Sequence, residues 1–193
     1  MTTVLRPMGE PEPSGGSGRL YPTVLGAAWR DLPEPVRALH TLRAGGGASG
    51  RADVEGATRP VARLVARIFG LPGSAQGVPV RVTFAARGIR EVWTRDFAGR
   101  RFASIQEPAG SPGRLVERFG PFALDLRLIP DGRGLGIEVA GARLLGVPLP
   151  RAVRPDGAAR EAGDAAGRFT FDVRISFRRI GMLVHYRGWL RPD

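Results

Sequence analysis

The chain has 193 residues, of which 42% are hydrophobic and 24% charged; this is the composition of one ordinary globular domain and excludes an entirely disordered chain. It contains no cysteine, no run of about 18 apolar residues and no apolar N-terminal segment, which excludes disulfides, thiolate metal sites and a membrane span and predicts a cytoplasmic protein. The net charge is +11, but all 29 basic residues are arginines scattered along the chain, so we predict no specific nucleic-acid binding.

Residues 1–18 are rich in Pro, Gly, Ser and Glu, which predicts a flexible tail ahead of a single domain over 19–193. Apolar residues then recur three and four positions apart over 20–29, which is the spacing of a helix with one buried face. A second short helix is predicted over 34–42, because Pro35 suits the first turn of a helix. The domain is therefore expected to begin with short helices.

The clearest predicted helix covers 60–69, with Pro60 in its first turn and Gly70 at its end. Arg63 and Arg67 lie on one face of this helix. The apolar residues share the other face, at the spacing i, i+3, i+4, i+7 and i+8: Val61, Leu64, Val65, Ile68 and Phe69. Because an apolar stripe of this kind covers a neighbouring element, we expect the helix to pack with it on the sheet that follows.

From Val80 onwards apolar and polar residues alternate, which is typical of strands with one buried face. The pattern predicts strands over 80–84, 91–97, 101–107, 114–119, 122–129, 135–144, 168–177 and 182–190. Residues 50–56 allow one further short strand. Residues 151–167 are rich in Ala, Gly, Asp and Arg, and we predict one long loop there.

Short connections between half-buried strands predict an antiparallel arrangement. About eight such strands are expected to curve strongly or to close like a barrel, because a long open sheet leaves unpaired edges. The predicted fold class is therefore α+β: a mostly antiparallel, barrel-like sheet, short N-terminal helices, and one helix packed on the sheet.

Several segments carry a family resemblance: LYPTVLGAAWRDLPEPVRALH, VPVRVTF, EVWTRDFAGRRF, LVERFGPFAL, GARLLGVPLP, RFTFDVRISF and GMLVHYRGWL. Together they resemble the DUF4166 family, a bacterial domain of unknown function, over nearly the whole chain from about Leu20 to Pro192. The resemblance implies no assigned activity and no catalytic residues. Members of the family occur alone or attached to dehydrogenase-like domains, which implies a dehydrogenase-like partner by analogy.

The sequence contains none of the common catalytic signatures, such as HExxH, a P-loop or a GxSxG elbow. We predict no metal and no cofactor, and the sequence identifies no catalytic residue. Of the two histidines, His40 ends a predicted helix, where a cation complements the helix dipole. His185 lies on the last predicted strand.

Two charged residues, Arg95 and Glu117, share strand faces with large apolar side chains. Their faces also carry Trp93, Phe97, Leu115 and Phe119. If these faces point inward, burying the charges costs several kcal/mol unless they are paired. Three interpretations stay open: the sheet is two-sided here and Arg95 lies at a rim, the two charges form a buried pair, or they contact the polar head of a ligand.

The last strand, with His185 and Tyr186, is partly apolar on both faces. The candidate ligand-binding residues are Trp93, Arg95, Glu117, Phe119, His185 and Tyr186. We hypothesise a binding module that holds a small apolar or amphipathic molecule in the concavity of the sheet. The alternative is an enzyme, or an accessory domain of an oxidoreductase system, which uses Arg95, Glu117, His185 and Tyr186 for acid–base chemistry.

Overall fold

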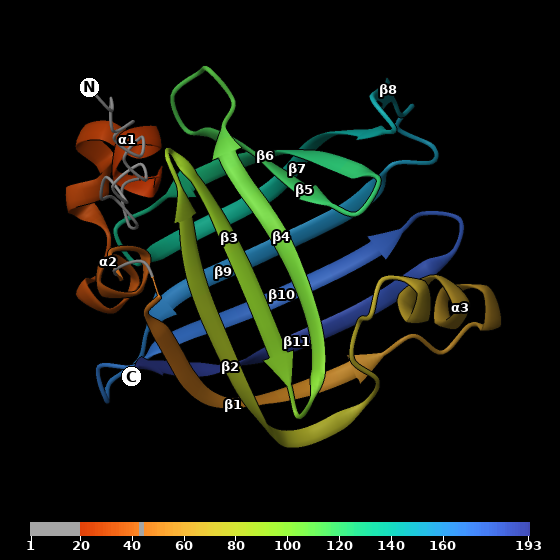
Figure 1. Cartoon of the computed structure of the whole chain (residues 1–193), viewed down its shortest axis with the longest axis horizontal. Helices are drawn as coiled ribbons and strands as arrows, with labels where there is room; N and C mark the ends of the chain where they lie inside the picture. Colours follow the sequence, from red (N-terminus) through yellow and green to blue (C-terminus); the bar gives the residue numbers. More distant parts are fainter. Residues whose placement is uncertain (1–19, 43–44) are drawn as a thin grey trace, which may run out of the picture.

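Antiparallel strands joined by short turns make up most of the molecule (Figure 1). This computed structural model describes residues 20–42 and 45–193, and the predicted tail over 1–18 lies outside them. One sheet contains the following strands: β1 (Gly47–Gly56), β2 (Ala75–Arg87), β3 (Arg90–Phe97), β4 (Arg100–Pro108), β5 (Arg114–Phe119), β6 (Phe122–Pro130), β7 (Gly134–Leu144), β8 (Val147–Pro148), β9 (Pro155–Gly163), β10 (Phe169–Phe177) and β11 (Gly181–Pro192).

The sheet closes on itself. β1 pairs with both β2 and β11, and β6 pairs with both β5 and β7, so the series of strands has no free end. Ten strands form the barrel, and the short β8 pairs only with β7. The prediction of an antiparallel, barrel-like sheet is confirmed, but the predicted number of about eight strands is too low. Closure satisfies the backbone groups that an open sheet would leave unpaired.

The strands that the sequence did not predict lie where apolar and polar residues do not alternate clearly. β9 occupies most of the segment 151–167, so the prediction of one long loop there is wrong. Its inward positions are small or polar, Gly157, Ala159 and Glu161, and give no apolar alternation. β9 forms because it pairs along its length with β10 on one side and β7 on the other. Pairing on both sides outweighs weak intrinsic strand propensity.

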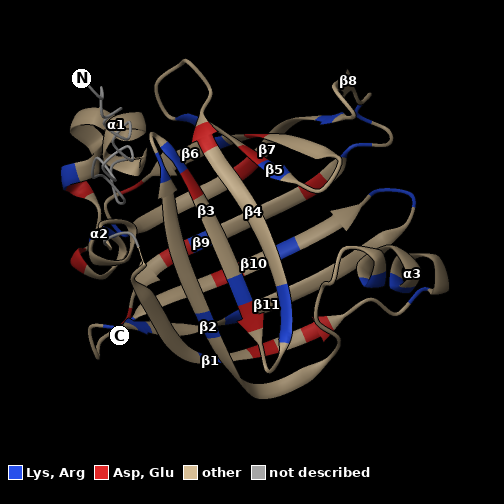
Figure 2. Cartoon of the chain, viewed as in Figure 1, with Lys and Arg blue, Asp and Glu red and all other residues tan. Residues whose placement is uncertain are grey.

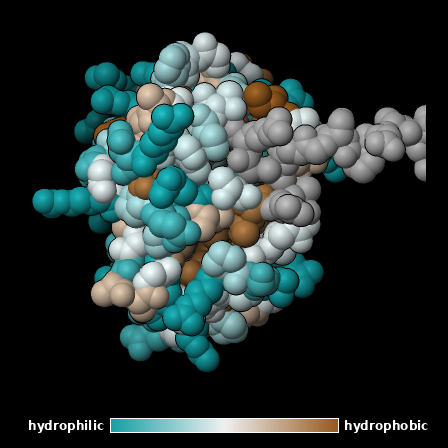
Figure 3. Space-filling model, turned by 90° about the vertical axis from the view of Figure 1, so that its left-hand side faces the viewer, coloured by the Kyte–Doolittle hydropathy of each residue, from teal (hydrophilic) through white to brown (hydrophobic). Residues whose placement is uncertain are grey.

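Short helices cover one end of the barrel: α1 (Leu20–Leu25), the 3-10 helix η1 (Gly26–Asp31) and α2 (Glu34–His40). Leu20, Tyr21, Val36 and Leu39 on their inner faces are buried. Seen from this end (Figure 3), the surface is mainly hydrophilic, and apolar atoms are visible near its centre. In the described part of the chain, no helix has the length and apolar character that crossing a membrane requires.

Helix α3 (Pro60–Ile68) lies at the opposite end and packs against β11 (Figure 1). Its buried residues are Ala62 and Ala66, whereas Val61, Leu64 and Ile68 are 60%, 60% and 70% exposed. The helix packs on the sheet as predicted, but the prediction that its whole apolar stripe covers the sheet is wrong, because only Val65 and Phe69 of the stripe pack against the core. The small alanines allow close approach to the sheet, and Phe69 reaches the barrel interior.

Candidate ligand site inside the barrel

Side chains do not fill the barrel completely. The interior contains a cavity of about 180 Å³, counted as the space open to the centre of a water-sized sphere. One water needs only about 10–15 Å³ on this measure, so the cavity has room for a small molecule. Its wall is mainly aromatic and aliphatic and includes Val80, Phe97, Phe102, Phe171, Val173 and Ile175. The barrel thus encloses apolar space of the kind in which proteins bind small ligands.

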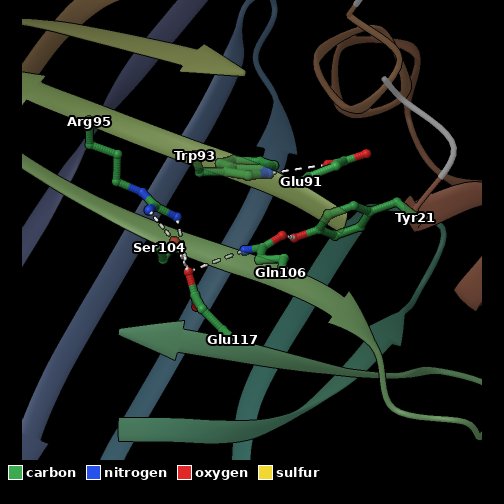
Figure 4. Close-up of polar contacts among 7 residues, drawn as sticks. All are labelled: Tyr21, Glu91, Trp93, Arg95, Ser104, Gln106 and Glu117. Carbon is green, nitrogen blue, oxygen red and sulfur yellow. Dashed lines mark hydrogen bonds and ion pairs between the residues drawn. The ribbon is translucent and has the colours of Figure 1, made fainter. Parts of the chain in front are cut away.

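A polar cluster centred on Arg95 interrupts this apolar wall (Figure 4). The side chains of Arg95 and Glu117 are only 15% and 18% exposed. Arg95 Nη1 donates a hydrogen bond to Ser104 Oγ at 2.9 Å, and Arg95 Nη2 donates one to Glu117 Oε1 at 3.4 Å. The guanidinium carbon lies 5.3 Å from the centre of the Trp93 ring and 5.6 Å from that of Phe102. Hydrogen bonds, charge and two cation–π contacts therefore hold Arg95 in place.

Glu117 Oε1 is the common acceptor of the cluster. Besides the bond from Arg95, it accepts one from Ser104 Oγ at 2.6 Å and one from Gln106 Nε2 at 3.3 Å. These contacts follow from strand register, because Gln106 on β4 lies opposite both Glu91 on β3 and Glu117 on β5. The second carboxylate oxygen, Oε2, accepts no hydrogen bond from residues 20–42 or 45–193.

Helix α1 extends the cluster from its end of the barrel. Tyr21 Oη donates to Gln106 Oε1 at 3.0 Å, which joins the helix to the Glu117 group (Figure 4). The buried Glu91 accepts from Trp93 Nε1 at 3.2 Å and from the backbone N–H of Leu20 at 3.4 Å. The first turn of the described chain is therefore fixed by polar groups inside the barrel.

A histidine and a carboxylate meet beside this cluster. His40 Nε2 lies 2.6 Å from Glu161 Oε2, and the His40 side chain is fully buried. Its ring stacks on Tyr21 with the ring centres 3.7 Å apart. His40 Nδ1 is buried without a hydrogen-bond partner among the described residues. His40 does end α2, as predicted, but its side chain contacts groups inside the molecule.

Burial and neighbouring carboxylates raise the pKa values of the two tyrosines. Burial, with smaller contributions from Glu117 and Glu161, raises the pKa of Tyr186 to about 12, although Arg95 opposes the shift. Burial, and then Glu161, Glu117 and Glu91, raise the pKa of Tyr21 well above its usual value. Burial lowers the pKa of Arg95, but Glu117 and the two tyrosines raise it more, so the net shift is upward. Burial is thus the largest single influence on the pKa of each of the three groups, and the carboxylates raise all three pKa values.

We expect the two tyrosines, the only ones in the chain, to stay protonated in the folded protein well above pH 10. An unfolded tyrosine loses its proton near pH 10, whereas Tyr186 keeps it until about 12. The folded state then binds more protons than the unfolded state, so stability should fall as the pH rises from about 10. The ultraviolet absorbance of tyrosinate measures the ionisation of the tyrosines directly. In the variant Tyr21→Phe, Tyr186 is the one tyrosine left to give this signal. An ionisation step at pH 10 in the folded protein would contradict it.

Five of the six predicted site residues line the cavity: Trp93, Arg95, Glu117, Phe119 and Tyr186. His185 does not. It lies on the outer side of β11, where its Nε2 is 2.8 Å from Asp172 Oδ1 and its Nδ1 is 3.8 Å from Glu55 Oε2. Because neighbouring residues of a strand point to opposite faces, Tyr186 and His185 cannot both point inward. The acid–base set of the alternative hypothesis therefore does not assemble with His185.

Several polar residues of the site were not predicted from the sequence. Ser104 and Gln106 share one face of β4 with Phe102, so the period-two pattern that put Arg95 on a face with Trp93 and Phe97 would have found them. Glu161 was out of reach, because its segment was predicted as a loop. Across residues 20–42 and 45–193, no group of three or more His, Asp or Glu side chains is arranged to hold a metal ion.

The chain is thus a closed antiparallel barrel with a polar cluster in the wall of an apolar cavity. Residues 32–190 match the model of the family described as "Domain of unknown function (DUF4166)", so the protein belongs to the DUF4166 family, as its motifs predicted.

Among solved structures, the chain is similar to a Nostoc punctiforme protein of unknown function from the DUF3598 family, with a TM-score of 0.46 and 12% sequence identity. The similarity covers 77% of this chain and 47% of that protein, so the chain spans about half the length of the other. No curated protein matches the sequence.

Proposed function

We propose that the protein binds a small amphipathic molecule inside the barrel, with an apolar body and an uncharged, hydroxylated head. The observation that supports this is the cavity of about 180 Å³, whose apolar wall carries Arg95, Glu117 and Tyr186 together. A fully packed core would gain more stability from apolar side chains at these places, because buried charges are costly even when they are paired. A ligand gives a reason for both the space and the charges.

The body of the ligand is apolar because most of the cavity wall is. Aromatic and aliphatic side chains from both halves of the barrel face the space. Transfer of apolar surface from water contributes about 25 cal/mol per Å², so a short hydrocarbon chain or ring system binds through burial alone. Apolar cavities of this kind accept apolar molecules without rearrangement.

The head of the ligand is a group that both donates and accepts hydrogen bonds. The Tyr186 hydroxyl makes no hydrogen bond with any described residue, and Glu117 Oε2 is likewise unused. Both residues line the cavity, as Arg95 does, and Glu117 and Arg95 both affect the pKa of Tyr186. A hydroxyl can donate to the free carboxylate oxygen and accept from the tyrosine.

Charge argues against an acidic head. The carboxyl groups of Glu117 and Glu161 both line the cavity, where Glu117 binds Arg95 and Glu161 contacts His40. Arg95 is already bound to Glu117, so a carboxylate ligand would add a further negative charge to a buried site. We therefore expect long-chain alcohols and hydroxylated ring compounds to bind in preference to fatty acids.

A cavity-filling variant with a matched control tests this function. Ala159 faces the cavity from β9, whereas Ala103 on β4 is exposed and does not line the cavity. We expect the purified wild type to bind dodecanol and the uncharged probe N-phenylnaphthylamine, Ala159→Phe to bind neither, and Ala103→Phe to bind like the wild type. Binding is measured by probe fluorescence and displacement, and folding by circular dichroism. If the wild type binds neither compound, or if both variants bind equally well, the cavity is not the site.

A further inference from the structure

The end of the barrel that carries α3 is built from several connected pieces, called here the α3 end: α3, the turns β5–β6, β7–β8 and β10–β11, and the loop 149–154. Phe69, just after α3, contacts the rings of Phe119 and Phe122 on either side of the β5–β6 turn. The backbone of that turn accepts a hydrogen bond from the N–H of Leu145 in the β7–β8 turn. These contacts make the α3 end one continuous surface.

This surface is unusually apolar for a solvent-facing one. Eight large hydrophobic residues are strongly exposed within the described part of the chain, and six of them belong to the α3 end: Val61, Leu64, Ile68, Leu145, Val147 and Val153. The three on α3 are spaced by three and four residues, so they form one stripe on the outer face of the helix. Exposed stripes of this kind mark interaction surfaces.

Arginines flank the apolar stripe. Arg59, Arg63 and Arg67 are exposed on and beside α3, and Arg178 and Arg179 are exposed in the β10–β11 turn (Figure 2). The two groups adjoin, because the side chain of Arg59 lies over the backbone of Gly181. None of the five forms an ion pair with residues 20–42 or 45–193, whereas the nearby Glu55 lies close to His185.

We propose that the α3 end docks on the surface of an anionic lipid bilayer. A helix with an apolar stripe and arginines beside it matches the two layers of such a surface: the stripe enters the boundary of the acyl chains while the guanidinium groups bind lipid phosphates. Nucleic acid would use the arginines but leave the apolar stripe in water. The +11 charge of the chain favours approach to a negative surface.

Docking in this orientation also places one end of the cavity at the lipid. Phe69 and Leu71, which directly follow α3, line the cavity wall. An amphipathic molecule leaving the bilayer would therefore meet the barrel at its α3 end. The docking itself does not depend on which molecule the cavity holds, and it is measured without any ligand.

The test is co-sedimentation of the full chain with vesicles of phosphatidylcholine alone or mixed with phosphatidylglycerol. We expect the wild type to bind the anionic vesicles at least about tenfold more strongly. The double variant Arg63→Glu/Arg67→Glu should lose most of this binding. Arg87→Glu/Arg133→Glu has the same net charge but changes exposed arginines at the opposite end, so its binding should fall by less than about threefold.

The apolar stripe has its own variant, Val61→Ser/Leu64→Ser/Ile68→Ser. It keeps the charge of the chain, and because these side chains are exposed it should unfold like the wild type. We expect it to lose at least about tenfold in vesicle binding. Equal losses in the two arginine variants, or unchanged binding of the serine variant, would show that general positive charge or another partner explains this surface. Either result, or no binding by the wild type, overturns the proposal and leaves the cavity function untouched.

Discussion

Glu117→Gln is expected to convert the barrel from a binder of alcohols to a binder of carboxylates. The substitution keeps the shape of the side chain but removes the negative charge that neutralises Arg95 at 3.4 Å. An unpaired buried guanidinium is costly, and a ligand carboxylate can restore the lost pair. We expect the variant to bind dodecanoate roughly tenfold or more tightly than the wild type does, which is about 1.4 kcal/mol or more. Displacement of the fluorescent probe measures both affinities.

The role of Arg95 in this change is tested by removing its charge as well. In Arg95→Met/Glu117→Gln the gained affinity for dodecanoate should disappear, because no cation is left to bind it. Dodecanoate should also raise the unfolding temperature of Glu117→Gln but not of the double variant, since a ligand stabilises the state that it binds. If Glu117→Gln gains no carboxylate affinity, or if the double variant retains the gain, Arg95 and Glu117 are not at the head-group position.

Gly188→Ala is expected to destabilise the fold strongly. Gly188 lies on β11 opposite Ala52 of β1, and a Cβ atom there would be 2.1 Å from the backbone oxygen of Arg51. It would also be 2.9 Å from a ring carbon of Phe171. Because the oxygen belongs to the backbone, the strands must separate to relieve the clash. We expect a loss of about 3 kcal/mol in the free energy of unfolding, measured in urea.

Gly73→Ala is the matched control. No atom lies within 4 Å of the position that its Cβ would take, and its backbone has an ordinary negative φ. The same change of residue should therefore alter stability by less than about 0.5 kcal/mol. A loss at Gly73 as large as that at Gly188 would mean that the close approach of β1 and β11 is not the cause.

Local patterns in the sequence were sufficient to predict the strands that have one clearly apolar and one clearly polar face. Along β10 and β6, large apolar residues alternate with polar ones, so one face had to be buried whichever strands came to lie beside them. The same argument allowed Arg95 and Glu117 to lie inside, because each shares its strand face with aromatic residues. The structure shows the two charges inside the barrel and paired with each other, whereas their contact with the head of a ligand stays a proposal.

Other features depend on contacts between residues far apart in the chain, which no local period records. β9 is a strand because β7 and β10 pair with it, and α3 buries Ala62 and Ala66 because it packs against β11 with that face. His40 and Glu161, which are 121 positions apart in the chain, are within hydrogen-bond distance of each other. The pairing of β6 with β7 closes the barrel. Periodicity shows which face of an element is apolar, whereas only the packed structure shows what covers that face, because burial depends on every neighbour together.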